Sequence, residues 1–162
     1  MTSAEEAAPA PDMAAAWFTL GRLRLERAPW WAAQWLTEGH DGPAMLALAC
    51  LDGTDHGEIR DLLPRALAEM NTTTPTVFDA AVLVFDDMAR RHLAGERDER
   101  WVIRRVDEVL LSTDYPATII DLPLGELYSY ADYWDEPWGP SEDERRHIVH
   151  DRCTRQLQRP PD

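Results

Sequence analysis

Apolar residues recur at spacings of three and four residues through nearly the whole chain between residues 13 and 158. Such spacing places them on one face of an α-helix, whereas a half-buried β-strand needs apolar and polar residues in strict alternation. No alternating run is long enough to make a convincing strand. The pattern predicts an all-α fold, either a single irregular, orthogonal bundle of about seven or eight short helices or two packed helical hairpin units.

Residues 36–58, "LTEGHDGPAMLALACLDGTDHGE", place two histidines and several acidic residues around an apolar run. One interpretation is a metal site formed by His40, Asp41, Asp55 and His56. No spacing typical of a metal-binding motif is present. Asp41 and Asp55 instead stand where two short helices need side-chain acceptors at their N-termini, and Gly39 and Gly53 stand where helices end. The stretch therefore favours helix boundaries over a metal site.

Further helices are predicted over residues 56–70, 75–94, 99–111, 121–134 and 141–158. Pro64 is expected to kink or split the first of them. The helix over 75–94 is the candidate centre of the core, with one stripe formed by Phe78, Val82, Phe85, Ala89 and Leu93. The helix over 121–134 is expected to face inward through Leu124, Leu127, Ala131 and Trp134. Ser141 and Glu144 are typical of a capping box at the start of the last helix.

The two ends of the chain differ in composition from the part between them. Residues 1–12, rich in Ala, Pro and Glu, predict a disordered tail, residues 13–158 a single all-helical domain, and residues 159–162 a second tail. The N-terminus lacks the basic and apolar regions of an export signal, and no apolar run approaches the roughly 20 residues that cross a bilayer. These features predict a cytoplasmic protein without membrane contact.

The chain carries 30 acidic residues against 16 basic ones, a net charge of −14. This charge disfavours binding to nucleic acid or to anionic membranes. All of the basic residues are arginine, and the complete lack of lysine fits a GC-rich, bacterial genome. Cys50 and Cys153 form no CxxC motif and lie in apolar helical patterns, where inert, buried thiols are expected.

Negative charge is concentrated in residues 106–144, which contain eleven acidic residues and no arginine. Within this window "LYSYADYWDEPW" interleaves tyrosine and tryptophan with carboxylates. Such a surface suits an arginine- or lysine-rich partner through charge complementarity and cation–π contacts. The predicted partner-binding residues are Glu126, Tyr130, Asp132, Tyr133, Asp135, Glu136 and Trp138. The alternative is a solubilising acidic face whose aromatic rings partly pack.

A second candidate site is a carboxylate and histidine cluster on the last helix, formed by Glu144, His147, His150 and Asp151. An ExxH step is half of a di-iron motif, but the chain has no second ExxH, and the apolar stripe of this helix predicts that the histidines face solvent. No motif of nucleophilic catalysis or of phosphate binding is present. No catalytic residue, metal ligand or cofactor is therefore assigned.

A cluster of arginines over residues 90–105 contains Arg90, Arg91, Arg97, Arg100, Arg104 and Arg105. These arginines are expected either to pair with the acidic window inside the chain or to meet the acidic face of a second copy.

The hypothesis that these features favour is a non-catalytic, acidic module that binds a basic protein, such as an immunity or antitoxin-like inhibitor. The alternatives are a helical metal-dependent enzyme or metal-binding protein that uses the last helix, and a homo-oligomeric adaptor.

Overall fold

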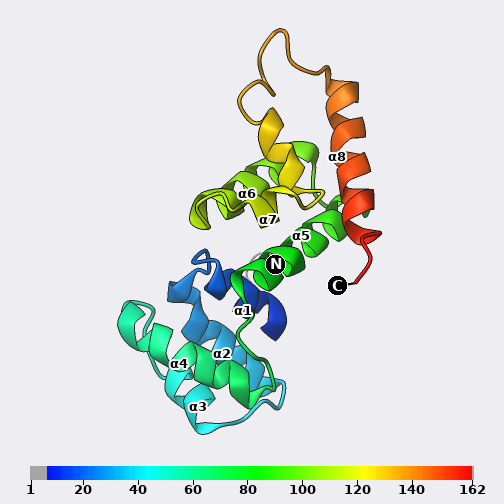
Figure 1. The fold of residues 1–162 in the computed structure, drawn as a ribbon. Coiled ribbons are helices and arrows are strands. Elements are labelled where there is room, and N and C mark those ends of the chain that lie inside the picture. Colours follow the sequence, from blue (N-terminus) through cyan, green and yellow to red (C-terminus); the bar gives the residue numbers. More distant parts are fainter. Residues whose placement is uncertain (1–6, 162) are drawn as a thin grey trace. The chain divides into compact units, whose positions relative to one another are not determined.

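The computed structural model describes residues 7–161 and contains helices but no strand in that range (Figure 1). The predicted all-α class is confirmed. The described residues form two compact units that divide between Thr76 and Val77. A single domain over 13–158 stays a prediction, and each unit is described by itself.

Unit 1 comprises α1 (Pro11–Thr19), η1 (Leu25–Arg27), α2 (Ala28–Thr37), α3 (Pro43–Ala49) and α4 (His56–Glu69). Helix α3 packs against both α2 and α4. Large buried side chains from these three helices fill the core, namely Trp35, Met45, Leu48, Ile59, Leu63 and Leu67. Trp31, near the start of α2, is also buried in this core.

The helix boundaries in unit 1 agree with those predicted from the sequence at Gly39 and Asp55 but not at Asp41. Gly39 follows α2 with a φ of 96°, and Asp55 Oδ1 accepts the backbone N–H of Glu58 at 3.1 Å. Asp41 does not cap α3. The carboxylate of Glu69, at the end of α4, instead accepts the first backbone N–H groups of α3, from Ala44 at 2.8 Å and Met45 at 2.9 Å. The predicted cap was wrong because the acceptor comes from a distant helix.

A second difference in unit 1 concerns Pro64, which lies inside α4 without splitting it. His40 and His56 are both exposed, and no metal-binding group forms around them within the described residues.

Unit 2 comprises α5 (Val77–Leu93), α6 (Glu99–Ser112), α7 (Ala117–Ile120), η2 (Gly125–Tyr130) and α8 (Glu142–Leu157). Helices α5 and α8 pack side by side, and η2 packs against α6 (Figure 1). The largest buried side chains are Phe85, Met88, Leu110, Ile119, Leu124 and Leu127. The predicted helix over 99–111 is confirmed as α6, whose inward face is formed by Val102, Val106, Val109 and Leu110, all buried.

Most of the predicted stripe of α5 is confirmed. Phe85 and Ala89 are buried and Phe78 and Val82 are half-buried, whereas Leu93 at the end of the helix is exposed. Arg91 lies 2.9 Å from Asp87, four residues earlier on the helix. The carboxylate of Asp86 accepts a side-chain N–H of Gln156, on α8, at 2.8 Å. Asp86 therefore points toward α8 and not toward Arg90, four residues later on its own helix.

The predicted helix over 121–134 is largely wrong. Only the short 3-10 helix η2 forms, followed by turns, and Ala131 is exposed instead of buried. Two contacts stabilise a backbone conformation here that is not α-helical. The N–H of Leu124 donates to Gln156 Oε1 at 3.3 Å, and Gly125 lies so close to α7 that a Cβ there would be 2.0 Å from the carbonyl oxygen of Ile119. Leu124, Leu127 and Trp134 still reach the core as predicted.

The ends of the chain also have defined structure near the helices. Helix α1 begins at Pro11, inside the predicted tail, and the backbone N–H of Ala8 donates to Gln34 Oε1 at 3.2 Å. Residues 1–6 and Asp162 of the predicted tails lie outside the described residues. None of the described helices combines the length and the apolar composition that a membrane crossing needs.

The two cysteines lie in different environments, which corrects the expectation that both are buried. Burial raises the pKa of the Cys153 thiol to about 12, whereas Cys50 is exposed. Because the thiolate is the reactive form, we expect the folded protein at pH 8 to react with one equivalent of a disulfide reagent such as DTNB and the unfolded protein with two. Rapid reaction of two thiols in the folded protein would contradict the burial of Cys153.

Candidate functional site: an acidic aromatic groove

The chain between η2 and α8 is a series of tight turns. The backbone N–H of Glu136 donates to the carbonyl of Tyr133 at 3.2 Å, and that of Gly139 donates to the carbonyl of Glu136 at 2.9 Å. A Cβ at Gly139 would lie 2.1 Å from the carbonyl oxygen of Tyr133, so the turn closes only with glycine at this position. The turns fix the side chains of residues 130–138 relative to one another.

Aromatic rings from this segment contact one another in sequence. The Tyr130 ring lies 6.0 Å from the ring of Trp134, which is buried, and 5.7 Å from that of Tyr133. Tyr133 in turn stacks on Trp138, with centroids 5.6 Å apart and planes inclined by 26°. Trp138 nevertheless remains 73% exposed. The row of rings therefore leads from the core to a large apolar surface in solvent.

These rings form one wall of an open groove of about 700 Å³, and the first turns of α8 form the other. The groove is lined by Tyr130, Tyr133, Trp138, Gly139, Pro140, Asp143, Glu144, His147 and Ile148. We call it the acidic aromatic groove. Its lining holds two carboxylates and no arginine, so its charge favours a cation.

The Ser141–Glu144 capping box predicted from the sequence is confirmed, and it holds one of these carboxylates in place. The backbone N–H of Ser141 donates to Glu144 Oε2 at 2.7 Å, and the N–H of Glu144 donates to Ser141 Oγ at 3.3 Å. Hydrogen bonding from the Ser141 backbone lowers the pKa of Glu144 below its ordinary value. Glu144 thus presents a fixed negative charge at the edge of the groove.

Two of the predicted partner-binding acids pair with arginines of the same chain. Asp135 lies 3.1 Å from the guanidinium of Arg100 and 3.3 Å from that of Arg145. Glu126 lies 2.8 Å from Arg152 and has Arg155 at 3.8 Å. Because their charges are largely compensated within unit 2, these two residues add little attraction for an external cation.

The other predicted residues have the expected exposure or lie at the groove. Tyr130, Tyr133 and Trp138 line it, while Asp132 and Glu136 are exposed and have no ion-pair partner among the described residues. Because the segment is a 3-10 helix followed by turns, no single α-helical face presents Glu126, Tyr130, Tyr133 and Glu136 together.

Sequence reasoning missed the contribution of α8 to the groove. Asp143 and Glu144 were counted in the acidic window, and His147 was assigned to another cluster, but these residues were not predicted to lie beside Tyr133 and Trp138. The indicative signal was the "EPWGPS" segment, in which proline and glycine turn the chain back toward the rings.

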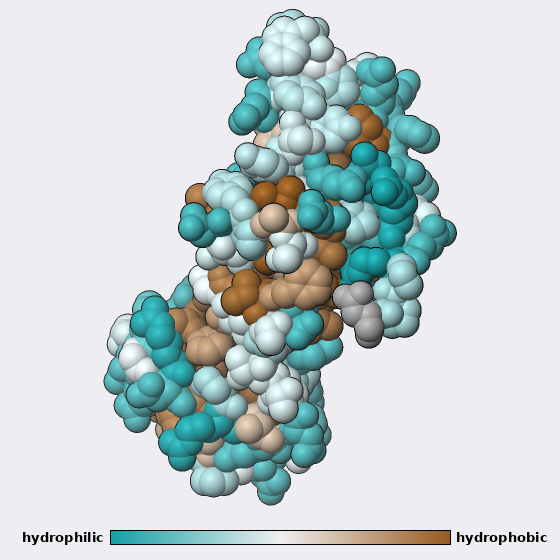
Figure 2. All heavy atoms as spheres, viewed as in Figure 1, coloured by the Kyte–Doolittle hydropathy of each residue, from teal (hydrophilic) through white to brown (hydrophobic). Residues whose placement is uncertain are grey.

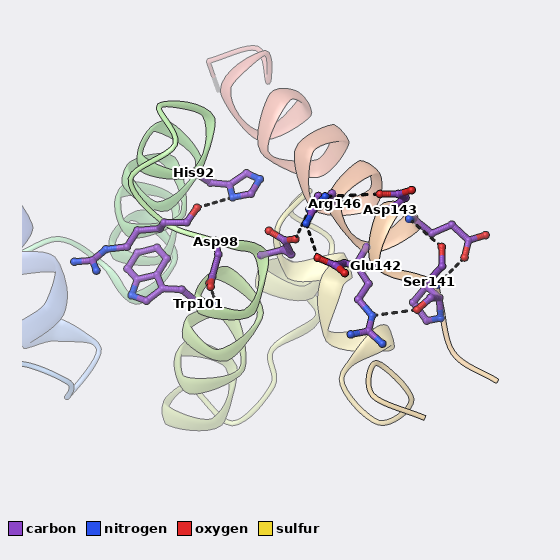
Figure 3. A network of polar contacts seen from close by, with 12 residues as sticks. His92, Asp98, Trp101, Ser141, Glu142, Asp143 and Arg146 are labelled. Atoms are coloured by element: carbon purple, nitrogen blue, oxygen red, sulfur yellow. Dashed lines mark hydrogen bonds and ion pairs between the residues drawn. The ribbon is translucent and has the colours of Figure 1, made fainter. Parts of the chain in front are cut away.

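A balanced polar network lies on the adjoining side of α8. Arg146 contacts Glu142, lies 3.2 Å from Glu99 and has Asp143 at 3.7 Å (Figure 3). A hollow of about 610 Å³ beside it is lined by Asp98, Glu99, Arg100, Trp134, Glu142, Arg145 and Arg146. Since acids and arginines are equal in number there, this hollow lacks the one-sided charge of the acidic aromatic groove.

The carboxylate and histidine cluster of the last helix is not assembled as a metal site. His147 and His150 are exposed, as predicted, but Glu144 belongs to the capping box and Asp151 lies 2.6 Å from Arg152. Among residues 7–161, no three histidine, cysteine or acidic side chains are grouped to hold a metal ion.

The arginine cluster over 90–105 is partly paired inside the chain, which was one of the two alternatives expected from the sequence. Arg105 lies 2.7 Å from Glu108, in addition to the pairs of Arg91 and Arg100 already described. Arg90 and Arg104 are exposed.

Figure 2 shows residues of intermediate hydropathy over the turn segment that precedes α8 and hydrophilic residues along α8 itself. This surface joins aromatic and charged groups instead of forming a purely apolar patch. Comparison of the chain with protein-family models, with curated proteins and with solved structures gives no match.

Proposed function

We propose that the protein is a non-catalytic binding module that docks a basic segment of another protein in the acidic aromatic groove. The observation that carries this proposal is the composition of the groove, in which the exposed Trp138, two half-buried tyrosines and two carboxylates line the same space with no arginine in the lining. Aromatic rings supply contact area at a low entropic cost, and the carboxylates supply attraction and orientation for a cation.

Exposed acids in the groove and on the turn segment that forms it support the same proposal. Asp132 and Glu136 are exposed on the turn segment that carries the aromatic rings. The side chain of Asp143 is 96% exposed and has Arg146 only at 3.7 Å. Long-range attraction from such charges raises the rate of encounter with a basic partner. An inhibitor of the immunity or antitoxin type, which covers a cationic surface of its target, is one form that this function takes.

A second candidate is self-association, in which the exposed Arg90 and Arg104 of one copy enter the groove of another. Analytical ultracentrifugation separates the two candidates, because self-association predicts a dimer or larger assembly at micromolar protein concentration that dissociates as salt rises.

The proposal is tested by titrating the protein with a blocked twelve-residue peptide in which arginine, glycine, lysine and glycine repeat. We expect binding that weakens by roughly tenfold or more as the Debye length falls from about 10 Å at 0.1 M salt to about 3 Å at 1 M. A peptide with glutamate at the basic positions is the control and is expected not to bind. Absence of binding by the basic peptide at low salt would overturn the proposal.

A further inference from the structure

We infer that the cation taken by the acidic aromatic groove is the guanidinium of arginine, stacked on Trp138, and that the groove discriminates arginine from lysine. This inference rests on the proposed function and adds the chemical identity of the ligand.

The chain itself shows how its tryptophans are covered. The guanidinium of Arg27 lies 4.9 Å from the centre of the Trp30 ring, and that of Arg145 lies 5.7 Å from Trp134. Trp101 has two such partners, Arg97 at 5.2 Å and Arg105 at 5.9 Å. A planar guanidinium is weakly hydrated and stacks on an aromatic face, so this arrangement recurs wherever an arginine reaches an indole.

Trp138 differs from these three tryptophans. Tyr133 stacks on one of its faces, yet the side chain remains 73% exposed, so the rest of the indole is in solvent. The contacts of Trp138 within the described residues include no arginine, and the lining of the groove contains none. An arginine from outside the chain would therefore give Trp138 the arrangement that Trp30, Trp101 and Trp134 already have.

The carboxylates of the groove suit the second feature of arginine, its fork of N–H donors. Glu144 Oε2 accepts the backbone N–H of Ser141, which holds the side chain in position while its second oxygen stays available. Asp143, one residue earlier, lines the same groove. A guanidinium stacked on Trp138 keeps N–H donors in its plane for a neighbouring carboxylate, whereas the compact ammonium of lysine offers neither the plane nor the fork.

The experiment compares two blocked peptides of equal length and charge, one alternating arginine with glycine and the other lysine with glycine. Affinities are measured by isothermal titration calorimetry for the wild-type protein, for Trp138→Leu and for Trp30→Leu. The last is the matched control, because Trp30 is also exposed but already has Arg27 over its ring. Circular dichroism establishes that each variant is folded.

We expect the arginine peptide to bind the wild type and Trp30→Leu about fivefold more tightly than the lysine peptide, because both cations are attracted to the ring but only the planar guanidinium also stacks on it and donates through its fork. Trp138→Leu is expected to bind both peptides with about the affinity that the wild type has for the lysine peptide. Equal affinities in the wild type would overturn the arginine inference but leave the proposed function standing. Binding of neither peptide would overturn both, and a preference that survives in Trp138→Leu would show that another group selects arginine.

Discussion

Replacing Asp132, Glu136 and Asp143 together by their amides is expected to weaken binding of the mixed arginine and lysine peptide by roughly tenfold to a hundredfold. Asp143 lines the acidic aromatic groove, and Asp132 and Glu136 are exposed on the turn segment that carries its aromatic rings, so their loss removes attraction without changing the shape of the surface. The thermal midpoint is expected to stay nearly unchanged. Glu144 is left intact because its carboxylate also caps α8.

The matched control carries the same change in charge elsewhere. Asp41→Asn, Asp61→Asn and Glu96→Gln replace three exposed acids that do not line the groove. Either triple variant changes the net charge from −14 to −11. If the control weakens binding as much as the groove variant does, attraction comes from the charge of the whole molecule and the groove has no special role.

The second large effect is expected at Gln156, which is 1% exposed and joins three elements of unit 2. Its side-chain amide donates to Asp86 on α5 at 2.8 Å and accepts the backbone N–H of Leu124, just before η2, at 3.3 Å. Gln156→Leu keeps most of the side-chain volume but removes both hydrogen bonds, so that the Leu124 N–H loses its acceptor and Asp86 keeps only Arg159, at 3.9 Å. We expect the free energy of unfolding to fall by about 2–4 kcal/mol.

Urea denaturation followed by circular dichroism measures this loss. Gln158→Leu is the control, because Gln158 is exposed two residues further along. Gln156 connects Leu124, just before η2, to α8, and η2 leads into the turn segment of the groove. We therefore also expect Gln156→Leu to bind the basic peptide more weakly. A Gln156→Leu protein as stable as the wild type would show that water or rearranged side chains satisfy Asp86 and Leu124.

The parts of the fold that follow from local sequence were predicted well. Helix α6 has a regular apolar period, and α8 has a capping box encoded within four residues, so both were placed with the correct start. The all-α class follows from the same periodicity. These features depend only on neighbours along the chain, which a sequence displays directly.

The features that were missed depend on contacts between distant residues. The cap of α3 comes from Glu69, and the path of the chain after α7 depends on Gln156 and on the close approach at Gly125. A helical period continued through residues 121–134, so the sequence favoured an α-helix that tertiary contacts replace with turns.

The candidate site shows the same division. The concentration of acids and aromatic rings in residues 106–144 was visible in the sequence, and Tyr130, Tyr133 and Trp138 were correctly associated with one another. Which acids are already compensated was not visible, because Asp135 and Glu126 meet arginines through the fold. The contribution of α8 to the groove likewise depends on how the turns bring Asp143 and His147 beside the rings.

The most direct test of the groove is to locate the bound peptide by nuclear magnetic resonance. The ¹⁵N-labelled protein is titrated with the mixed basic peptide, and the indole signal of Trp138 is assigned with Trp138→Phe. We expect the largest chemical-shift changes on the Trp138 indole and on the backbone amides of residues 130–148. Shifts confined to unit 1 or spread evenly over the exposed acids would contradict the assignment of the acidic aromatic groove as the binding site.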